Sequence, residues 1–246
     1  MLAIIGGSGL DQWGRQHAGE QIPDTPYGQC SAALETVHHG DGKALFLPRH
    51  GRAHALAPHT INYRANLWAL REAGATRVVA VCAVGSIREA WMPGTLVLPV
   101  QIIDYTWGRK HTYFEDDALP LQHVDFTHPF SESLTAELSA SACQAGVSLI
   151  VDGVYGATQG PRLESAAEIN RLARDGVDLV GMTGMPEAGL ARELSLQYAI
   201  LAVVANLAAG RGQGLPLSLK EIHATLDNSM TDVKAVLSNW ISLYGH

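Results

Sequence analysis

Three short segments of this 246-residue chain are rich in glycine, arginine or histidine in a way that suits a small oxyanion. Residues 48–54 read PRHGRAH, residues 5–9 read IGGSG, and residues 160–162 read GPR. A glycine-rich turn exposes backbone N–H groups, and Ser8 adds a hydroxyl donor. Arg49 can offer two parallel charge-assisted hydrogen bonds to an anion. Together the three segments predict a phosphate site.

Apolar runs and helical spacing indicate which elements position these segments. Runs that stop at glycine, proline or polar residues predict strands at residues 2–5, 44–47, 77–84, 95–103, 153–157, 179–182 and 199–205. Apolar residues at helical spacing predict helices at residues 59–73, 132–145, 165–175, 187–196 and 219–243. Residues 107–129 are polar and aromatic and predict an excursion loop. Strands that alternate with helices predict one α/β domain over residues 1–246, with a mixed central sheet flanked by helices.

The bulk composition narrows the classes of function. The 47% hydrophobic and 17% charged residues are typical of a globular protein with a sizeable core. A net charge of −7 argues against nucleic acid or an anionic membrane as the main partner. The three cysteines have no metal-ligand spacing, and the N-terminus shows no signal-peptide pattern. These features predict a cytoplasmic protein with reduced thiols.

Polar candidate residues follow the predicted strands at the point where each strand ends. In open α/β sheets, ligands bind beyond the carboxyl ends of the strands. The side chains in such positions are Ser8, Arg49, His50, Ser86, Gln159, Met182, Thr183 and Asn206. We therefore expect them to converge on one pocket.

Six motifs, in this order along the chain, resemble the purine nucleoside phosphorylase superfamily and especially its trimeric methylthioadenosine phosphorylase branch. They are GGSG at 6–9, PRHGR at 48–52, NYRAN at 62–66, GSIRE at 85–89, GPR at 160–162 and MTGMPEA at 182–188. The resemblance implies the nucleoside phosphorylase fold and the phosphorolysis of an N-glycosidic bond, which yields a free purine and a pentose 1-phosphate. It implies inorganic phosphate as co-substrate, no metal or organic cofactor, and a homotrimer.

The resemblance also implies roles for individual residues. The phosphate is expected to be held by Ser8, Arg49, His50, Ala83 and Thr183. The nucleoside is expected to contact Met182 under the ribose, Leu163 against the purine face, and His123, which reaches the 5′ pocket of a neighbouring subunit.

The chain departs from the methylthioadenosine phosphorylase branch where the last strand ends. That branch has a Thr-Asp-Tyr-Asp motif whose carboxyl groups address adenine, whereas Ala205 is followed here by Asn206, Leu207 and Ala208. An amide cannot act as a proton donor of variable pKa, but it can donate to O6 of a 6-oxopurine and accept from N7–H. Glu164 aligns with the glutamate by which 6-oxopurine phosphorylases accept N1–H. Asn206 and Glu164 are therefore the predicted catalytic pair.

The substrate's 5′ end is expected to meet an aliphatic surface. Leu219 lies at about the place where the methylthio branch lines its pocket with aliphatic side chains, and with His123 it favours a methylthio group over a hydroxyl. The expected reaction converts 5′-methylthioinosine to hypoxanthine and 5-methylthioribose 1-phosphate. The alternatives are phosphorolysis of 5′-methylthioadenosine or of inosine and guanosine.

Other interpretations of the same residues stay open. A hydrolytic nucleosidase would use water in place of phosphate, and a binding protein would hold purine and phosphate without turnover. The glycine spacing disfavours a dinucleotide-dependent oxidoreductase. The glycine-rich turn could be a simple strand–helix connection, and Glu164 could cap the next helix. The acids and histidines of residues 107–129 match no metal motif, and His123 could be an ordinary surface histidine.

Overall fold

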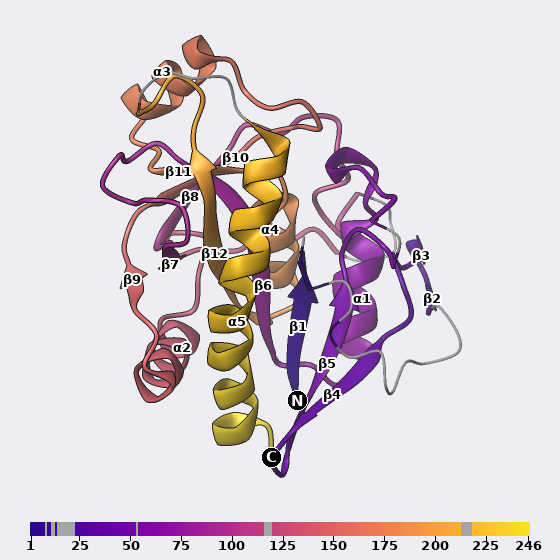
Figure 1. Cartoon of the computed structure of the whole chain (residues 1–246). Helices are drawn as coiled ribbons and strands as arrows, with labels where there is room; N and C mark the ends of the chain where they lie inside the picture. Colours follow the sequence, from indigo (N-terminus) through magenta and orange to yellow (C-terminus); the bar gives the residue numbers. More distant parts are fainter. Residues whose placement is uncertain (8, 11–12, 14–22, 53, 116–119, 213–217) are drawn as a thin grey trace.

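The computed structural model describes residues 1–7, 9–10, 13, 23–52, 54–115, 120–212 and 218–246. Among these residues it has a ten-stranded mixed sheet, a two-stranded ribbon, and helices around them (Figure 1). The large sheet contains β1 (Leu2–Gly6), β4 (Glu35–His39), β5 (Gly42–Pro48), β6 (Arg77–Ser86), β7 (Leu96–Leu98), β8 (Gln101–Asp104), β9 (Leu149–Val151), β10 (Val154–Ala157), β11 (Leu179–Gly181) and β12 (Gln197–Leu207). The ribbon pairs β2 (Asp24–Thr25) with β3 (Gly28–Gln29). The helices are α1 (Tyr63–Glu72), α2 (Glu132–Ala145), α3 (Ala166–Arg174), α4 (Gly184–Glu193) and α5 (Leu219–Tyr244), with a short 3-10 helix at Pro58–Thr60.

Strand β6 is the centre of the large sheet because it pairs with three other strands. β1 runs parallel along one side and β12 parallel along the other, while β11 runs antiparallel beside its last residues. The sheet continues through β5 and β4 beyond β1, and through β10 and β8 beyond β11. The carboxyl ends of β1, β5, β6 and β12 therefore meet at one edge of the sheet, the upper edge in Figure 1.

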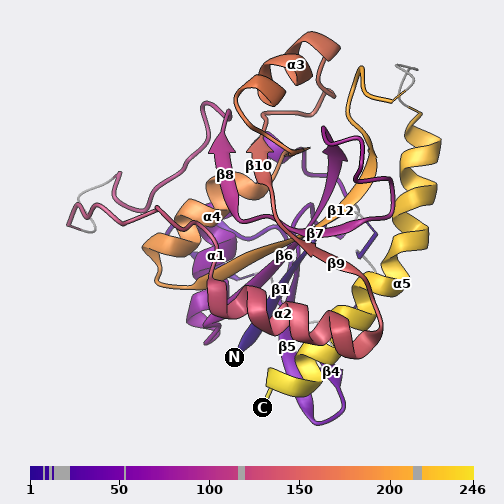
Figure 2. The same ribbon diagram turned by 90° about the vertical axis from the view of Figure 1, so that its left-hand side faces the viewer.

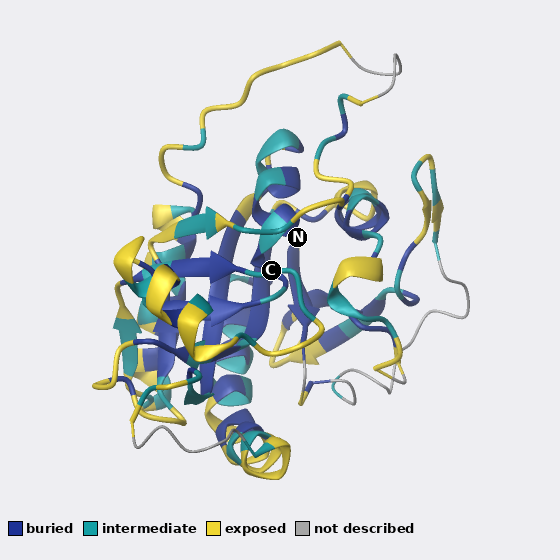
Figure 3. Ribbon diagram, turned by 90° about the horizontal axis from the view of Figure 1, so that it is seen from above, coloured by how far each residue is buried: buried dark blue, intermediate teal, exposed yellow. Residues whose placement is uncertain are grey.

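Both faces of the sheet are buried under helices. In β1, Ala3 and Ile5 join a core cluster with residues of α1 and α4, and Leu2 and Ile4 join a second cluster with residues of α2 and α5. This alternation is what a strand covered on both sides requires. Figure 2 shows α1 and α4 on one side of the strands and α5 on the other, and the central strands are dark blue in Figure 3.

The mixed α/β fold with a central sheet flanked by helices is confirmed, and the differences in detail have local causes. The predicted strand at 95–103 is two strands, β7 and β8, because Pro99 between them has no N–H to donate to a ladder. The predicted helix at 187–196 begins earlier, at Gly184, and ends at Glu193. It ends there because Ser195, with a φ of 58°, turns the chain toward β12.

Two further differences concern helix starts and short strands. The predicted helix at 59–73 begins at Tyr63, because the Asn62 side chain accepts a hydrogen bond from the Ala65 N–H and caps it. Strands β2, β3, β4 and β9 were not predicted, since they have two to five residues and carry no long apolar run.

The described residues between β8 and α2 form no helix or strand, in agreement with the loop predicted at residues 107–129. This excursion loop reaches away from the sheet at the left of Figure 2, and much of it is exposed in Figure 3. Within the described part of the chain, no helix combines the length and apolar character needed to cross a membrane.

Candidate active site

A cavity of about 480 Å³ lies at the edge of the sheet where the parallel strands end. Its wall is formed by the loop after β5, the ends of β6 and β12, the connection from β11 to α4, the loop before α3, and the first turns of α5. These segments are distant in sequence and meet because β5, β1, β6 and β12 run in the same direction. Ten of the predicted site residues line it: Arg49, His50, Ala83, Leu163, Glu164, Met182, Thr183, Asn206, Ala208 and Leu219.

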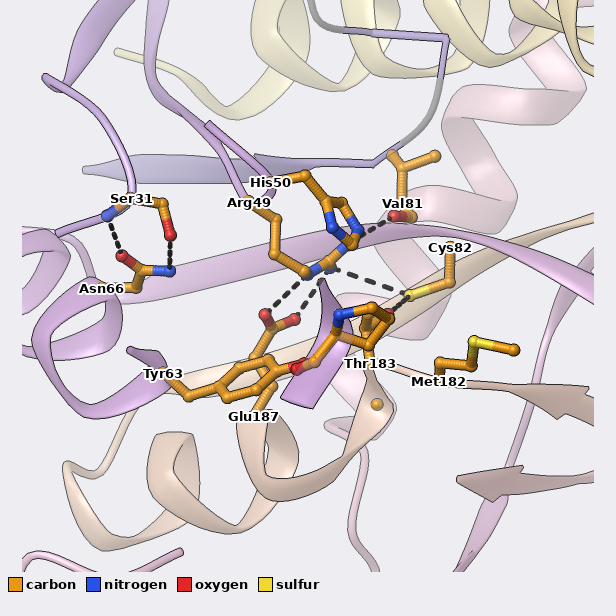
Figure 4. A network of polar contacts seen from close by, with 12 residues as sticks. Ser31, Arg49, His50, Tyr63, Asn66, Val81, Cys82, Met182, Thr183 and Glu187 are labelled. Carbon is orange, nitrogen blue, oxygen red and sulfur yellow. Dashed lines mark hydrogen bonds and ion pairs between the residues drawn. The ribbon is translucent and has the colours of Figure 1, made fainter. Parts of the chain in front are cut away.

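A buried ion pair between Arg49 and Glu187 lies at one end of this cavity (Figure 4). Arg49 Nε donates to Glu187 Oε2 at 2.8 Å, and Nη2 donates to Oε1 at 2.9 Å. The Tyr198 hydroxyl also donates to Glu187 Oε1, at 2.8 Å. Burial alone would lower the pKa of Arg49, but the adjacent Glu187 carboxylate outweighs burial and raises that pKa well above its usual value. The guanidinium is therefore a fixed positive charge in a dry surrounding.

This ion pair corrects one expectation about Arg49. The two parallel donors that were expected to face an oxyanion are occupied by Glu187, because that carboxylate has the matching geometry. Arg49 Nη1 donates one hydrogen to the Val81 carbonyl at 3.0 Å, and its second hydrogen has no acceptor among the described residues. A Cβ atom on Gly7 would lie 3.2 Å from Nη1 and 2.6 Å from the Val81 oxygen, so only glycine fits there.

His50 lies beside Arg49 and is held in one orientation. Its Nδ1 is 2.8 Å from the Leu56 carbonyl oxygen. Because a carbonyl only accepts, Nδ1 carries the hydrogen, and Nε2 is left as the acceptor in the neutral ring. The ring stacks on that of His54, with centroids 4.4 Å apart. His50 therefore presents an imidazole of fixed orientation beside Arg49 in the cavity wall.

Thr183 and Cys82 complete this end of the cavity. The Thr183 hydroxyl lies 3.5 Å from Cys82 Sγ, and Thr183 precedes the first turn of α4 without bonding to that turn through its side chain. The hydroxyl therefore remains able to bind a ligand. Burial raises the pKa of Cys82 even though Arg49 lies close by, so this side chain is a thiol and not a nucleophilic thiolate at neutral pH.

Glu164 also lines the cavity and is fixed by a neighbouring hydroxyl. Thr158 Oγ1 donates to Glu164 Oε1 at 2.6 Å, while Oε2 has no donor among the described residues. Glu164 does not cap a helix in this structure, which was the alternative role considered for it. Ser165 caps α3 instead, in a capping box with Glu168. One oxygen of Glu164 is thus held and the other can accept from a ligand.

Asn206 reaches the cavity through an irregularity in β12. The pairing of β12 with β6 shifts between Val204 and Asn206, so that Ala205 is an extra residue and Asn206 pairs with Gly85. Such a β-bulge changes the direction of the following side chain. Asn206 Nδ2 donates one hydrogen to the Leu207 carbonyl at 2.7 Å, which leaves a second N–H and the amide oxygen for other partners.

Three predicted residues are not among the described residues that line the cavity. Ser8 lies outside the described residues. Leu207 is half-buried and does not line the cavity of the described chain, although its carbonyl holds the Asn206 amide. His123 is exposed in the excursion loop and does not line the cavity of its own chain. Of the other strand-end candidates, Ser86 donates to the Arg88 carbonyl and Gln159 accepts from Arg109.

Several residues that hold or line this site were not predicted from the sequence. Glu187 was part of a quoted motif, but nothing in the sequence indicates that it pairs with Arg49, 138 positions away. Tyr198, Thr158 and Arg109 also support the site from outside its lining, and only their contacts reveal this. His223 of α5 lines the cavity, and its exposed helical position gives no signal.

The described residues contain no group of three or more His, Cys, Asp or Glu side chains placed to share a metal ion. The polar groups that line the cavity fall instead into two sets: a guanidinium, an imidazole and a hydroxyl form one set, and a carboxylate and a carboxamide form the other. The first set suits a small anion and the second suits a ring that carries both donors and acceptors.

Comparisons with known proteins agree with this arrangement. A family model described as the phosphorylase superfamily matches residues 1–242. A protein of Pseudomonas syringae pv. tomato named probable S-methyl-5′-thioinosine phosphorylase is 48% identical, over 98% of this chain and 98% of its own length. The 6-oxopurine nucleoside phosphorylase of Pyrococcus furiosus is 41% identical, over 96% and 91%.

Structural comparison leads to the same family. The methylthioadenosine phosphorylase of Schistosoma mansoni in complex with adenine superposes with a TM-score of 0.93 and 30% sequence identity. That similarity covers 99% of this chain and 91% of the other. With matching sequence, matching fold and a cavity at the sheet edge, the chain belongs to the phosphorylase superfamily and is an enzyme of the purine nucleoside phosphorylase type.

Proposed function

We propose that this enzyme cleaves 5′-methylthioinosine with inorganic phosphate, giving hypoxanthine and 5-methylthioribose 1-phosphate. The observation that carries the proposal is that groups suited to an oxyanion and groups suited to a 6-oxopurine line the same cavity. No cofactor is needed, since phosphate is itself the nucleophile. The relative from Pseudomonas syringae, whose name describes a phosphorylase of the same substrate, supports the proposal.

Phosphate binds at the Arg49 end of the cavity. The Arg49 charge attracts it, the remaining Nη1 hydrogen and the Thr183 hydroxyl donate to it, and the His50 ring lies beside it in the cavity wall. Ser8 and the Ala83 backbone complete the set that the family resemblance implies. Glycosidic cleavage passes through an oxocarbenium-like sugar, so a phosphate oxygen held next to C1′ stabilises the positive charge as it develops. Orientation of that oxygen supplies much of the remaining rate enhancement.

The purine binds between Glu164 and Asn206. Glu164 Oε2 accepts from N1–H of hypoxanthine, whereas adenine offers only a lone pair at N1 and would leave the carboxylate unpaired. The free N–H of Asn206 donates to O6, and its carbonyl accepts from N7–H of the departing base. When the wrong base leaves a buried polar group unpaired, kcat/KM for its nucleoside can be lower by several orders of magnitude. Leu163 packs against the ring, and Leu207 and Ala208 complete this part of the pocket.

The ribose and its 5′ substituent lie between Met182 and the first turns of α5. Leu219 and Ile222 line the cavity there and suit a methylthio group better than a hydroxyl. We infer that the active molecule is a cytoplasmic homotrimer in which His123 of one subunit reaches the 5′ pocket of the next. The exposed position of His123, outside its own chain's cavity, supports that arrangement.

The test is a comparison of kcat/KM for methylthioinosine, methylthioadenosine and inosine, each with and without phosphate. The proposal predicts phosphate-dependent release of hypoxanthine from methylthioinosine at the highest kcat/KM. A preference for methylthioadenosine would contradict the base assignment, and a preference for inosine would contradict the 5′ assignment. Turnover without phosphate would indicate a nucleosidase, and binding without turnover would indicate a ligand-binding protein.

A further inference from the structure

Arg109 is a buried arginine of the excursion loop whose six polar contacts all lie around the cavity. Its side chain is 8% exposed and outside the cavity lining of the described residues. Nη1 donates to the Met182 carbonyl at 2.9 Å and to the Met185 carbonyl at 2.6 Å. Nη2 donates to the Thr158 and Gln159 carbonyls at 3.2 and 2.9 Å, and Nε to Gln159 Oε1 at 3.2 Å.

These acceptors belong to two neighbouring segments that follow β10 and β11, which pair as far as the Thr158 N–H and the Gly181 carbonyl. Met182 and Met185 lie on either side of Thr183, one of the residues proposed to hold phosphate. Thr158 holds Glu164 through its hydroxyl, and the loop from Gly160 to Glu164 follows it. A single planar group therefore connects the segment under the sugar with the segment beside the base.

A third wall of the cavity is connected through Tyr63. Arg109 Nη1 lies 3.3 Å from the Tyr63 hydroxyl, which donates to the Pro58 carbonyl at 2.8 Å. Pro58 belongs to the cavity-lining loop that follows β5. The guanidinium also lies over the Tyr63 ring, with Cζ 5.6 Å from its centroid.

The partners of Arg109 are unusual for a buried cation. No carboxylate lies within ion-pair distance of it among the described residues, and backbone carbonyl dipoles take that place. Burying a charge without a counter-ion is unfavourable unless its hydrogen bonds are satisfied. A side chain kept there only to fill space could be apolar. The arginine guanidinium instead carries five N–H donors in a fixed planar arrangement, which allows it to bond to several carbonyls from different segments at once.

We propose that Arg109 is a positioning residue that holds the sugar-binding and base-binding segments in place beyond the point where β10 and β11 stop pairing. The inference rests on the proposed function, because it concerns the placement of a nucleoside across both segments. Arg109 touches no reacting atom in this arrangement and acts through Met182, Thr158 and Glu164. Lysine cannot replace it, since one ammonium group cannot reach carbonyls on both segments with the same geometry.

The experiment compares Arg109→Lys, Arg109→Met and Arg109→Ala with the wild type at a temperature well below each Tm. We expect kcat/KM for the preferred nucleoside to fall by about 10- to 100-fold in all three variants, because small displacements of bound groups are costly to catalysis. Guanidinium ion added to Arg109→Ala is expected to restore part of this loss. Hypoxanthine affinity, measured by calorimetry, is expected to weaken in parallel.

The matched control is Arg77→Met, which removes an arginine bonded to Glu137 and to the Tyr244 carbonyl at the far end of β6. It is expected to lower Tm and leave kcat/KM unchanged. The proposal is overturned if the Arg109 variants behave in the same way, or if Arg109→Lys retains wild-type turnover and hypoxanthine affinity. A wild type without phosphorolysis would contradict the proposed function, and hypoxanthine binding would then still decide the role of Arg109.

Discussion

At the scale of single residues, what each charged or amide side chain of the site can bind depends on the partners that it already has. Arg49 is a suitable anion-binding residue by type, but its strongest donors are committed to Glu187, which itself accepts from Tyr198. The residue types Arg49, Glu164 and Asn206 could be read from the sequence and its family motifs. Their partners could not, because residues 138 positions apart leave no local pattern.

The Arg49–Glu187 pair gives a prediction about stability. Glu187→Gln keeps the size of the side chain but leaves the buried guanidinium without its counter-charge, which costs about 3–5 kcal/mol for buried pairs in general. Tyr198→Phe is the control, since it removes one hydrogen bond to the carboxylate and should cost about 1.5–3 kcal/mol. Urea unfolding measures the loss in the free energy of unfolding for both variants. Equal losses in the two variants would mean that Glu187 does not compensate Arg49.

Asn206 gives a prediction about base preference. Asn206→Asp introduces a carboxyl group that can protonate an adenine-type base or accept a hydrogen bond from it. The kcat/KM for methylthioadenosine should therefore rise relative to that for methylthioinosine. We expect the ratio of their kcat/KM values to shift by about tenfold or more, which corresponds to about 1.4 kcal/mol of transition-state binding. Asn206→Ala serves as the control and should slow both substrates. An unchanged ratio in the aspartate variant would show that Asn206 does not contact the base.

At the scale of elements, the site is assembled from strand ends, one β-bulge and one helix start. Long buried strands such as β6 and β12 were predicted because their apolar runs are long and end at glycine or polar residues. The bulge at Ala205 could not be predicted, since it depends on how β12 pairs with β6. The break at Pro99 and the helix end before Ser195 were also missed, although proline gives a usable signal.

The start of α3 gives a prediction about pH. Arg162 donates to both oxygens of Glu168, and with the Ser165 N–H it lowers the pKa of Glu168 from 4.5 to about 2. A lowered folded-state pKa stabilises the protein above pH 4.5, and this contribution is lost as pH falls toward 2. Glu168→Gln should therefore lower Tm at pH 7, and its deficit should shrink on acidification.

The size of this effect is limited by exposure. The side chains of Arg162 and Glu168 are 71% and 44% exposed, so solvent screening keeps the contribution of their ion pair to stability small. Thermal unfolding followed from pH 7 to pH 3 measures it. A Tm deficit that stays constant over this range would mean that ionised Glu168 does not hold the start of α3.

At the scale of the whole molecule, the family and the mixed α/β fold were predictable because six motifs in order carry more information than any one of them. The predicted membership of the phosphorylase superfamily and the mixed sheet are confirmed. The assembly of the cavity depends on the shared direction of β5, β1, β6 and β12. That direction follows from the fold as a whole.

The assembly gives a prediction about subunits. If His123 completes the 5′ pocket of a neighbour, sedimentation should give a mass three times the 26.3 kDa of one chain. His123→Ala should then raise KM for methylthioinosine several-fold without changing that mass. A monomer with full activity would exclude the shared site.

The most direct test of the central claim is a crystal structure of the enzyme with hypoxanthine and phosphate bound together. We predict phosphate beside Arg49, His50 and Thr183, with the purine's N1–H on Glu164 and its O6 and N7 edge on Asn206. A base that lies in the cavity with Glu164 and Asn206 turned away from it would contradict the assignment of a 6-oxopurine substrate.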